Sequence, residues 1–152
     1  YFKKIGFDKS EYSLLCSLLG KQERSFGAVV FKGQDILLEH MRYGHYSLPK
    51  GHIEKEDKDG LACARREIKE ECGIDVSIKN PDETFSIVYS PFYGISKRVT
   101  FFIAECAEGK LKPQKEEVSD LRFASKEEAF QKLTFQSDKD VLAWALKEKK
   151  IS

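Results

Sequence analysis

Three glutamates whose spacing could hold a divalent cation lie close together near the middle of the chain. Glu67, Glu70 and Glu71 occupy positions i, i+3 and i+4, which share one face of an α-helix about one turn apart. Like charges held this close repel one another, so the arrangement costs free energy unless cations lie among them. Carboxylate oxygens suit Mg²⁺, which accepts a few of them, keeps several waters and binds the phosphates of a substrate. The spacing therefore predicts a site that holds Mg²⁺ against a polyphosphate.

The bare spacing also fits a solvated helix face, because Arg65, Arg66 and Lys69 stand beside the acids and i,i+4 ion pairs are common on exposed helices. The flanking residues favour a functional site instead. Gly51 ends a strand-like Leu-Pro-Lys-Gly segment, and a polar loop separates it from the acids. Gly73 follows the acids at the place where a helix C-terminus favours glycine. The acids are therefore expected on a helix that two glycines frame.

This framed segment resembles the signature of the Nudix hydrolases, a family that cleaves nucleoside diphosphates linked to another group. The family pattern is Gly-x5-Glu-x7-Arg-Glu-U-x-Glu-Glu-x-Gly-U, in which U is aliphatic. The second half of the pattern matches residues 66–74 without a gap. The resemblance implies an α/β fold: a Nudix-type α/β/α sandwich with a mixed central sheet and a loop-helix-loop metal site.

The first half of the signature is one residue longer than the family pattern. Counted from Gly51, the acidic position falls on Asp57, whereas counted back from the second half it falls on Lys58. We expect Glu56 or Asp57 to take this position and residues 56–60 to absorb the extra residue, because they are charged and carry a glycine.

The resemblance implies roles for the residues that match the signature. Glu67, Glu70 and Glu71 would ligate Mg²⁺, with Mn²⁺ as a possible substitute, and the Gly51 carbonyl would join them. Glu67 is our choice for the acid that orients or deprotonates the attacking water. Arg66 would pair with a glutamate one turn on, so that the acids keep their rotamers.

Several family members draw a further acid from a loop near the C-terminal end of the sheet. Glu116 and Glu117 occupy the matching place in this chain. Of the two we favour Glu117 as a catalytic and metal-binding residue, although paired acids in loops are also common as solvated charges.

The segments around the signature are similar to those of the asymmetric diadenosine tetraphosphate hydrolases. Residues 48–54 resemble the PKGHxE entry of that branch, and residues 97–105 resemble its K-x-V-x-x-hydrophobic-x-A-E strand. Residues 127–135 resemble its EEA…LTF helix and turn. The similarity covers residues 25 to about 146, so only the first two dozen residues fall outside it.

This similarity implies a substrate site. His45, Lys50 and Lys97 would contact phosphates, and Tyr89 and Phe135 would sandwich adenine. Each residue has a plainer interpretation, because lysines and a loop histidine are ordinary surface residues and aromatic residues near strands usually pack into the core.

The function predicted is Mg²⁺-dependent hydrolysis of nucleoside polyphosphates by a pyrophosphohydrolase of the bis(5′-nucleosyl)-tetraphosphatase type. Water would attack a phosphoanhydride of diadenosine tetraphosphate to release ATP and AMP. Removal of pyrophosphate from the 5′ end of RNA, or cleavage of another nucleoside diphosphate derivative, is the alternative. A nucleotide-sensing module without turnover is a third possibility, against which the intact acids argue.

Length and charge agree with a small enzyme acting on a small nucleotide. A chain of 152 residues fits one domain, which we assign to residues 25–150 after an N-terminal extension, residues 1–24, of unknown role. With 26 basic against 25 acidic residues, neither nucleic acid nor a membrane is an expected partner. The four cysteines show no CxxC spacing, so free thiols and a cytoplasmic location are expected. The oligomeric state is left open.

Hydrophobic periodicity predicts strands that alternate with helices, and hence a mixed sheet covered by helices. A hairpin is expected where two apolar runs flank Lys32-Gly33-Gln34-Asp35. Pro91 and Gly94 mark the expected loop between two later strands. The predicted strands span residues 25–31, 36–40, 76–78, 84–89, 98–105 and 121–124, and the predicted helices span residues 60–72, about 126–133 and 137–149.

Overall fold

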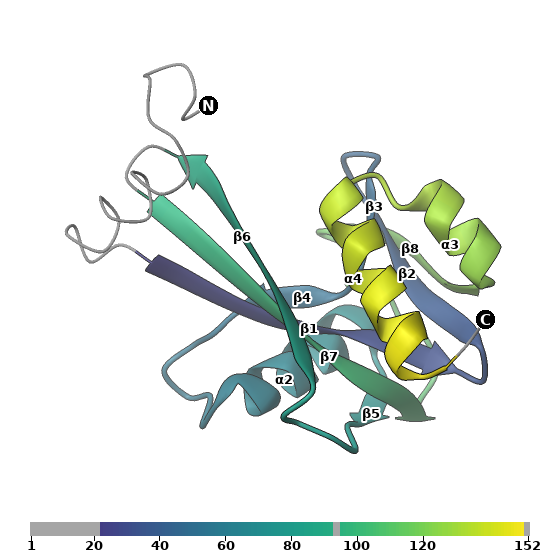
Figure 1. Ribbon diagram of the computed structural model, residues 1–152, viewed down its shortest axis with the longest axis horizontal. Coiled ribbons are helices and arrows are strands. Elements are labelled where there is room, and N and C mark those ends of the chain that lie inside the picture. The colour runs from purple at the N-terminus through teal and green to yellow at the C-terminus, as the bar shows by residue number, and fades with distance from the viewer. Residues whose placement is uncertain (1–21, 93–94, 151–152) are drawn as a thin grey trace.

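The computed structural model describes residues 22–92 and 95–150 (Figure 1). Within these residues, eight strands form one mixed sheet and three helices pack on it, which confirms the predicted α/β class. The elements in chain order are β1 (Gln22–Lys32), β2 (Asp35–Met41), β3 (Tyr46–Ser47), β4 (Lys50–His52), α2 (Gly60–Cys72), β5 (Asp75–Ser77), β6 (Thr84–Phe92), β7 (Ile95–Glu108), β8 (Val118–Ala124), α3 (Lys126–Lys132) and α4 (Gln136–Glu148).

The centre of the sheet is the parallel pair of β1 and β7, which stay in register from Gln22 and Ser96 to Phe31 and Glu105. All other described strand pairs are antiparallel. The main path runs β3-β2-β1-β7-β5, while β4 pairs with β1, β6 with β7 and β8 with β2. Because parallel neighbours need a crossover connection, the chain between β1 and β7 carries helix α2 across the sheet.

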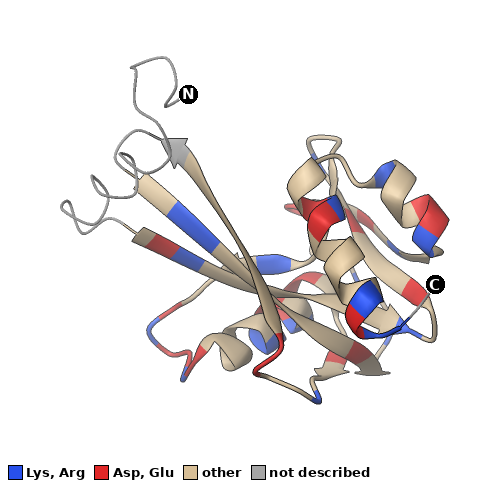
Figure 2. Ribbon diagram, in the orientation of Figure 1, with Lys and Arg blue, Asp and Glu red and all other residues tan. Residues whose placement is uncertain are grey.

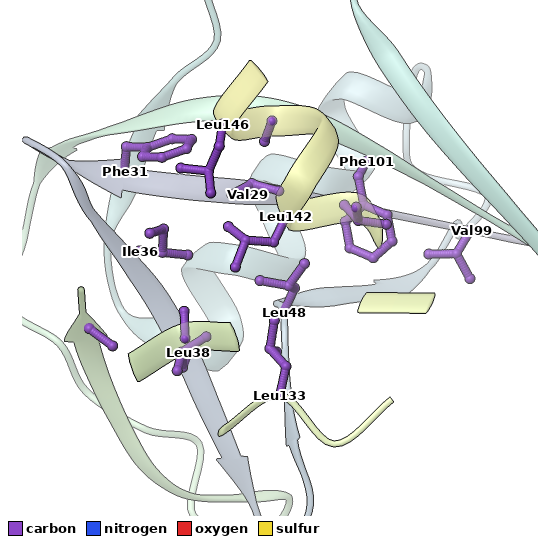
Figure 3. Packing of buried hydrophobic residues seen from close by; sticks show 14 residues of the cluster. Val29, Phe31, Ile36, Leu38, Leu48, Val99, Phe101, Leu133, Leu142 and Leu146 are labelled. Atoms are coloured by element: carbon purple, nitrogen blue, oxygen red, sulfur yellow. The ribbon is translucent and has the colours of Figure 1, made fainter. Parts of the chain in front are cut away.

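Alternation along β1 divides the apolar core between the two faces of the sheet. Val29 and Phe31 pack on one face against Leu142 and its neighbours in α4, as Figure 3 shows. The intervening Ala28 and Val30 pack on the other face, in the cluster that includes residues of α2. The sheet is thus covered on both faces, as an α/β/α sandwich requires.

Helix α2 begins and ends at the predicted residues, and local chemistry explains both limits. The Asp59 side chain accepts a hydrogen bond from the backbone N–H of Ala62, which satisfies one of the unpaired donors at the helix start. Gly73 ends the helix in the left-handed conformation, with φ of 78°, and its N–H donates to the Lys69 carbonyl. The predicted hairpin between β1 and β2 is also present.

Strand β4 can lie against β1 because residue 27 is glycine. A Cβ atom on Gly27 would lie 2.1 Å from the carbonyl oxygen of Pro49, so any side chain would push the two segments apart. The register places Gly27 opposite Lys50 and Phe26 opposite Gly51. The close approach therefore positions the two residues that precede the signature loop.

The loop predicted around Pro91 is wrong in extent, because β6 continues to Phe92 and β7 already begins at Ile95. Proline is tolerated there because β6 lies at the edge of the described sheet, beyond β7. Gly94 and residues 1–21, which include Cys16 and most of the proposed extension, lie outside the described residues. Strand β4 overlaps the strand-like segment that ends at Gly51, whereas the two-residue strand β3 was not predicted.

The described cysteines match the expectation of free thiols. Cys63 and Cys72 are buried and Cys106 is partly buried, all in the thiol form. No helix in the part of the chain that the structure describes has the length and hydrophobicity to span a bilayer.

Leu142 offers a direct test of the α4 face of the core, because it is fully buried in the cluster of Figure 3. Replacement by alanine should lower the free energy of unfolding by about 2–5 kcal/mol through lost burial and the cavity left behind. Urea unfolding followed by circular dichroism measures the change. Lys147→Ala, an exposed position on the same helix, should change stability by no more than about 0.5 kcal/mol.

Candidate active site

The three signature glutamates lie on α2 and differ strongly in burial. Glu70 is largely exposed, with 54% of its side chain accessible, whereas the Glu67 side chain is only 13% accessible. Glu71 is buried, with 6% of the residue exposed. One helix face thus presents carboxylates at three depths, from solvent to the interior of the sandwich.

Arg66 holds this acidic face and the preceding loop together. Its Nε donates to Asp57 Oδ1 and its Nη2 to Asp57 Oδ2, at 2.8 Å in each case. Its Nη1 donates to Glu67 Oε1 at 3.0 Å and to Glu70 Oε2 at 3.2 Å. The guanidinium also reaches the His52 carbonyl at 3.0 Å, so it fixes loop, strand end and helix by bidentate geometry.

Asp57, rather than the exposed Glu56, takes the acidic position of the loop, and it pairs with Arg66 more closely than Glu54, whose Oε1 lies 3.7 Å from Nη1. Its side chain is 4% exposed and accepts a further hydrogen bond from the Glu54 N–H at 2.8 Å. The hydrogen bonds from Arg66 lower the pKa of Asp57 to about 2. The longer loop therefore keeps an acid at the signature position counted from Gly51.

Gly51 leaves room for the carboxylate of Glu67. A Cβ atom at residue 51 would lie 2.0 Å from the carboxylate carbon of Glu67 and 2.2 Å from its Oε2. The Gly51 carbonyl, in turn, accepts a long contact of 3.6 Å from the Cys63 thiol. The backbone of Gly51 and the Glu67 carboxylate thus lie against each other.

A fourth carboxylate, from Glu39 of β2, joins the buried end of the acidic face. Glu39 is 2% exposed, its carboxyl lies against that of Glu71, and the Cys72 thiol donates to its Oε1 at 3.5 Å. Burial, and next the Glu39 carboxyl, raise the pKa of Glu71 well above its usual range. Burial likewise raises the pKa of Glu39.

Our sequence interpretation missed Glu39, although a signal was present. In β2, Leu38 faces the α4 core and Leu37 faces the α2 core, so the period of two directs residue 39 toward α2. An acid at such an inward position is uncommon without a partner or a ligand.

The loop before β8 is tied to the end of α2. Lys112 N–H donates to the Cys72 carbonyl at 2.8 Å, and Gln114 N–H donates to the Glu71 carbonyl at 3.0 Å. The loop brings exposed Glu117 close enough for its charge to raise the pKa of Glu39 and Glu71. Glu117 thus lies near Glu39 and Glu71, on the loop that precedes β8.

The residues present fit a hard divalent cation. All the side-chain donors at the predicted site are carboxylate oxygens, the set that suits Mg²⁺ or Mn²⁺, and buried Glu71 Oε2 has no hydrogen-bond partner. Among the described residues, no three acidic, histidine or cysteine side chains already surround one point. Glu67 and Glu70 instead accept from Arg66, while Glu71 faces Glu39.

A cleft of about 310 Å³ is lined by residues of β3, β4, β6 and the start of α4. Lys50 lines the cleft, whereas the next residue, Gly51, lies against Glu67. This follows because successive residues of a strand face opposite sides of the sheet. The charge of Lys50 also lowers the pKa of Glu39. The cleft is lined by His45, Ser47, Lys50, Ile87, Tyr89, Phe135, Ser137 and Asp138.

Four of the five predicted substrate residues line this cleft. His45, Lys50, Tyr89 and Phe135 line it, and Lys97 lies opposite Tyr89 on β7, with its Nζ 6.0 Å from the centre of the Tyr89 ring. Tyr89 and Phe135 are 41% and 51% exposed, so neither is a core aromatic.

The position of Phe135 follows from a clamp between two segments. The Tyr46 N–H donates to Thr134 Oγ1 at 2.8 Å, and the Thr134 N–H donates to the Tyr46 carbonyl at 3.2 Å. This places the Phe135 ring 5.5 Å from that of His45, at 59°. Burial is the main cause that lowers the pKa of His45, followed by the charge of Lys50.

Four further cleft residues were not predicted from the sequence: Ser47, Ile87, Ser137 and Asp138. Asp138 is the chemically notable one, because it is an acid with only 4% exposure. Burial raises the pKa of Asp138 to about 6, although the Lys50 charge lowers it. An acid in the first turn of a helix normally signals only the helix start, so the sequence gives no sign that Asp138 is buried at the cleft.

The NUDIX domain family model matches residues 21–145, which include the signature, the sheet and most of α4. The chain belongs to the NUDIX family. Members of the family generally use divalent metal ions.

Several solved structures share the fold. An Ap4A hydrolase from C. elegans is 23% identical, with a TM-score of 0.69 over 80% of this chain and 93% of that one. A NUDIX hydrolase from Nitrosomonas europaea is 24% identical, with a TM-score of 0.70 over 86% and 73%. An ADP-ribose pyrophosphatase from Streptococcus suis is 21% identical, with a TM-score of 0.63 over 86% and 92%.

A relative was also found by sequence, in Invertebrate iridescent virus 3. The protein, named "Putative hydrolase 111R", is 33% identical over 72 residues. The match covers 47% of this chain and 42% of the viral protein, so less than half the length of that relative is represented.

The Arg66–Asp57 pair predicts a pH dependence of stability. Because the pKa of Asp57 is lowered to about 2 in the native state, the pair stabilises fully above the ordinary aspartate pKa and progressively less as pH falls toward 2. Asp57→Asn should cost about 1–3 kcal/mol near pH 7, and this difference should shrink below about pH 4. Urea unfolding over this range measures it, with exposed Glu56→Gln as control; a constant difference would contradict the assignment.

Gly51→Ala should disrupt the acidic face without unfolding the chain, because the new methyl group would overlap the Glu67 carboxylate. We expect the affinity for Mn²⁺ to fall by at least about 10-fold, measured by electron paramagnetic resonance of the free ion. His52→Ala removes the exposed neighbouring side chain and should keep the affinity of the parent protein. Equal affinity in both variants would remove Gly51 from the site.

Proposed function

We propose that this chain is a hydrolase of nucleoside polyphosphates that works with bound Mg²⁺, for which Mn²⁺ can substitute. The preferred substrate is a dinucleoside tetraphosphate such as diadenosine tetraphosphate, cleaved by water to ATP and AMP. One observation supports this above the others: the acidic helix face and an aromatic cleft meet at Lys50 and Gly51. Lys50 would hold phosphates at the cleft, and its charge also acts on Glu39 of the acidic cluster.

The acidic residues would hold the cation and direct the water. Glu67, Glu70, Glu71, Glu117 and the Gly51 carbonyl are the proposed ligands. A bound divalent cation neutralises charge that develops on the phosphoryl oxygens and lowers the pKa of a coordinated water. Arg66 donates to Glu67 Oε1, so Oε2 would take up the proton of the attacking water.

The cleft residues would bind the rest of the substrate. Lys50 and Lys97 supply compact positive charge for phosphate oxygens, and His45 can donate a hydrogen bond from its ring. Tyr89 and Phe135 present exposed ring surface for a base, and such stacking contributes about 1–3 kcal/mol per base.

The alternative substrates rest on weaker support. Polynucleotides usually bind basic surfaces, whereas basic and acidic residues are interspersed along the chain in Figure 2 and the net charge is +1. A sensor without turnover has no need for the full set of signature acids. The partner we propose is therefore a small nucleotide, and the free thiols favour a reducing, cytoplasmic location.

A turnover screen with Mg²⁺ tests the proposal. Diadenosine tetraphosphate would be compared with nucleoside triphosphates, ADP-ribose, a nucleotide sugar and 5′-triphosphorylated RNA, with products resolved by chromatography. We expect the fastest reaction to release ATP and AMP. Activity on another substrate alone would refute the preference, and nucleotide binding without any turnover would favour a sensor.

Glu70→Gln should reduce kcat for the preferred substrate by at least about 100-fold, because it replaces a charged oxygen donor on the exposed part of the acidic face. The thermal unfolding curve should stay close to that of the parent protein. Glu127→Gln, an exposed glutamate of α3, is the matched control and should retain full activity. A near-normal rate in Glu70→Gln would refute the metal assignment.

A further inference from the structure

Asp138 is a buried acid for which the proposed chemistry has no use. It lies in the first turn of α4 and lines the cleft, but it belongs neither to the acidic face of α2 nor to the phosphate-binding lysines. Only 4% of the residue is exposed, so its carboxyl has largely lost contact with bulk water. Burying an acid costs free energy that ordinary helix-start acids avoid by staying solvated.

The packing around Asp138 does not account for this cost. Lys50 acts favourably on the carboxylate, whereas Glu39 acts unfavourably, and Lys50 is shared with the acidic face and the cleft. Asp140, two residues on, is exposed and accepts a hydrogen bond from Gln136 at 2.9 Å. The helix start therefore already carries a solvated acid, and burial of a second one favours a role in the cleft.

We infer that Asp138 is a specificity-determining residue that accepts a hydrogen bond from the amino group of a purine base held in the cleft. The inference rests on the proposed function, since it requires a nucleotide there. It adds the base preference: a purine that carries an exocyclic amino group, with adenine as the member present in the proposed substrate.

The layout of the cleft gives the reason. Tyr89 and Phe135 are the most exposed of its lining residues with large apolar side chains, so they offer the flat surfaces against which a base stacks. Asp138 and Ser47 are its buried polar residues. A base stacked on the exposed rings would direct an edge toward them.

The chemistry of a carboxylate then selects among base edges. An ionised carboxylate only accepts hydrogen bonds, so it pairs with an amino group and is left unpaired by a base that lacks one. A site that is built around a buried polar group discriminates strongly against a ligand that leaves this group unpaired. A loss of about 1.5–3 kcal/mol for a hydrogen bond to a charged group corresponds to roughly 10–100-fold.

Two matched pairs of nucleotides, with and without the amino group on the base, test the inference by binding and by turnover. Diadenosine tetraphosphate would be compared with the same dinucleotide carrying purine riboside, which lacks the 6-amino group, and AMP with purine riboside 5′-monophosphate by isothermal titration calorimetry. The parent protein should favour the adenine compounds by about 10–100-fold. Asp138→Ala should reduce the ratio to about threefold or less, whereas Asp138→Asn, which keeps an acceptor, should retain part of it.

The control is Asp140→Asn, which removes an exposed charge from the same helix and should keep the full preference. Equal affinity of the parent protein for AMP and its amino-free analogue would overturn the role of Asp138 while leaving hydrolysis intact. A preference that survives in folded Asp138→Ala would do the same. Failure to bind either nucleotide would overturn the inference together with the proposed function.

Discussion

The guanidinium of Arg66 is the contact on which the arrangement of the site depends. Through its five donors it joins the loop acid Asp57, the His52 carbonyl at the end of β4, and the carboxylates of Glu67 and Glu70. Without it, negative charges on one helix turn would repel one another and the loop would lose its tie to the helix. This one side chain therefore ties the signature loop, the end of β4 and helix α2 together.

Two glycines allow the backbone approaches that this arrangement requires. Gly27 lets β4 pair with β1, and Gly51 leaves space for the Glu67 carboxylate. Since neighbouring residues of a strand face opposite ways, the same short strand presents Lys50 to the cleft and Gly51 to the acids. Two successive residues of one strand thereby connect the cleft with the acidic face.

The carboxylates of the site differ in burial. Glu70 is exposed and Glu67 is mostly covered. Glu71 and Glu39 lie against each other in the interior, where burial raises the pKa of both carboxyls. Buried acids whose pKa is strongly raised are common at functional sites. Asp138, which lines the cleft, is a further acid whose pKa is raised by burial.

Short-range patterns were sufficient for much of the fold and of the acidic face. The limits of α2 follow from a cap at Asp59 and a glycine at residue 73, the hairpin follows from its turn residues, and the phase of the three glutamates follows from helix geometry. The resemblance to a known branch also indicated His45, Lys50, Tyr89 and Phe135, which line one cleft. The strand around Pro91 was misjudged, because edge position, which permits proline, is a property of the whole sheet.

The amino-acid sequence by itself determined which residues could ligate a cation, since helix period and local capping are set within a few positions along the chain. Only the tertiary structure decided that Glu39 meets Glu71, that Asp57 rather than Glu56 pairs with Arg66, and that Asp138 lines the cleft. The reason is physical: burial and charge proximity depend on how strands and helices pack across the sheet. Residues that are distant in sequence acquire their chemistry from that packing.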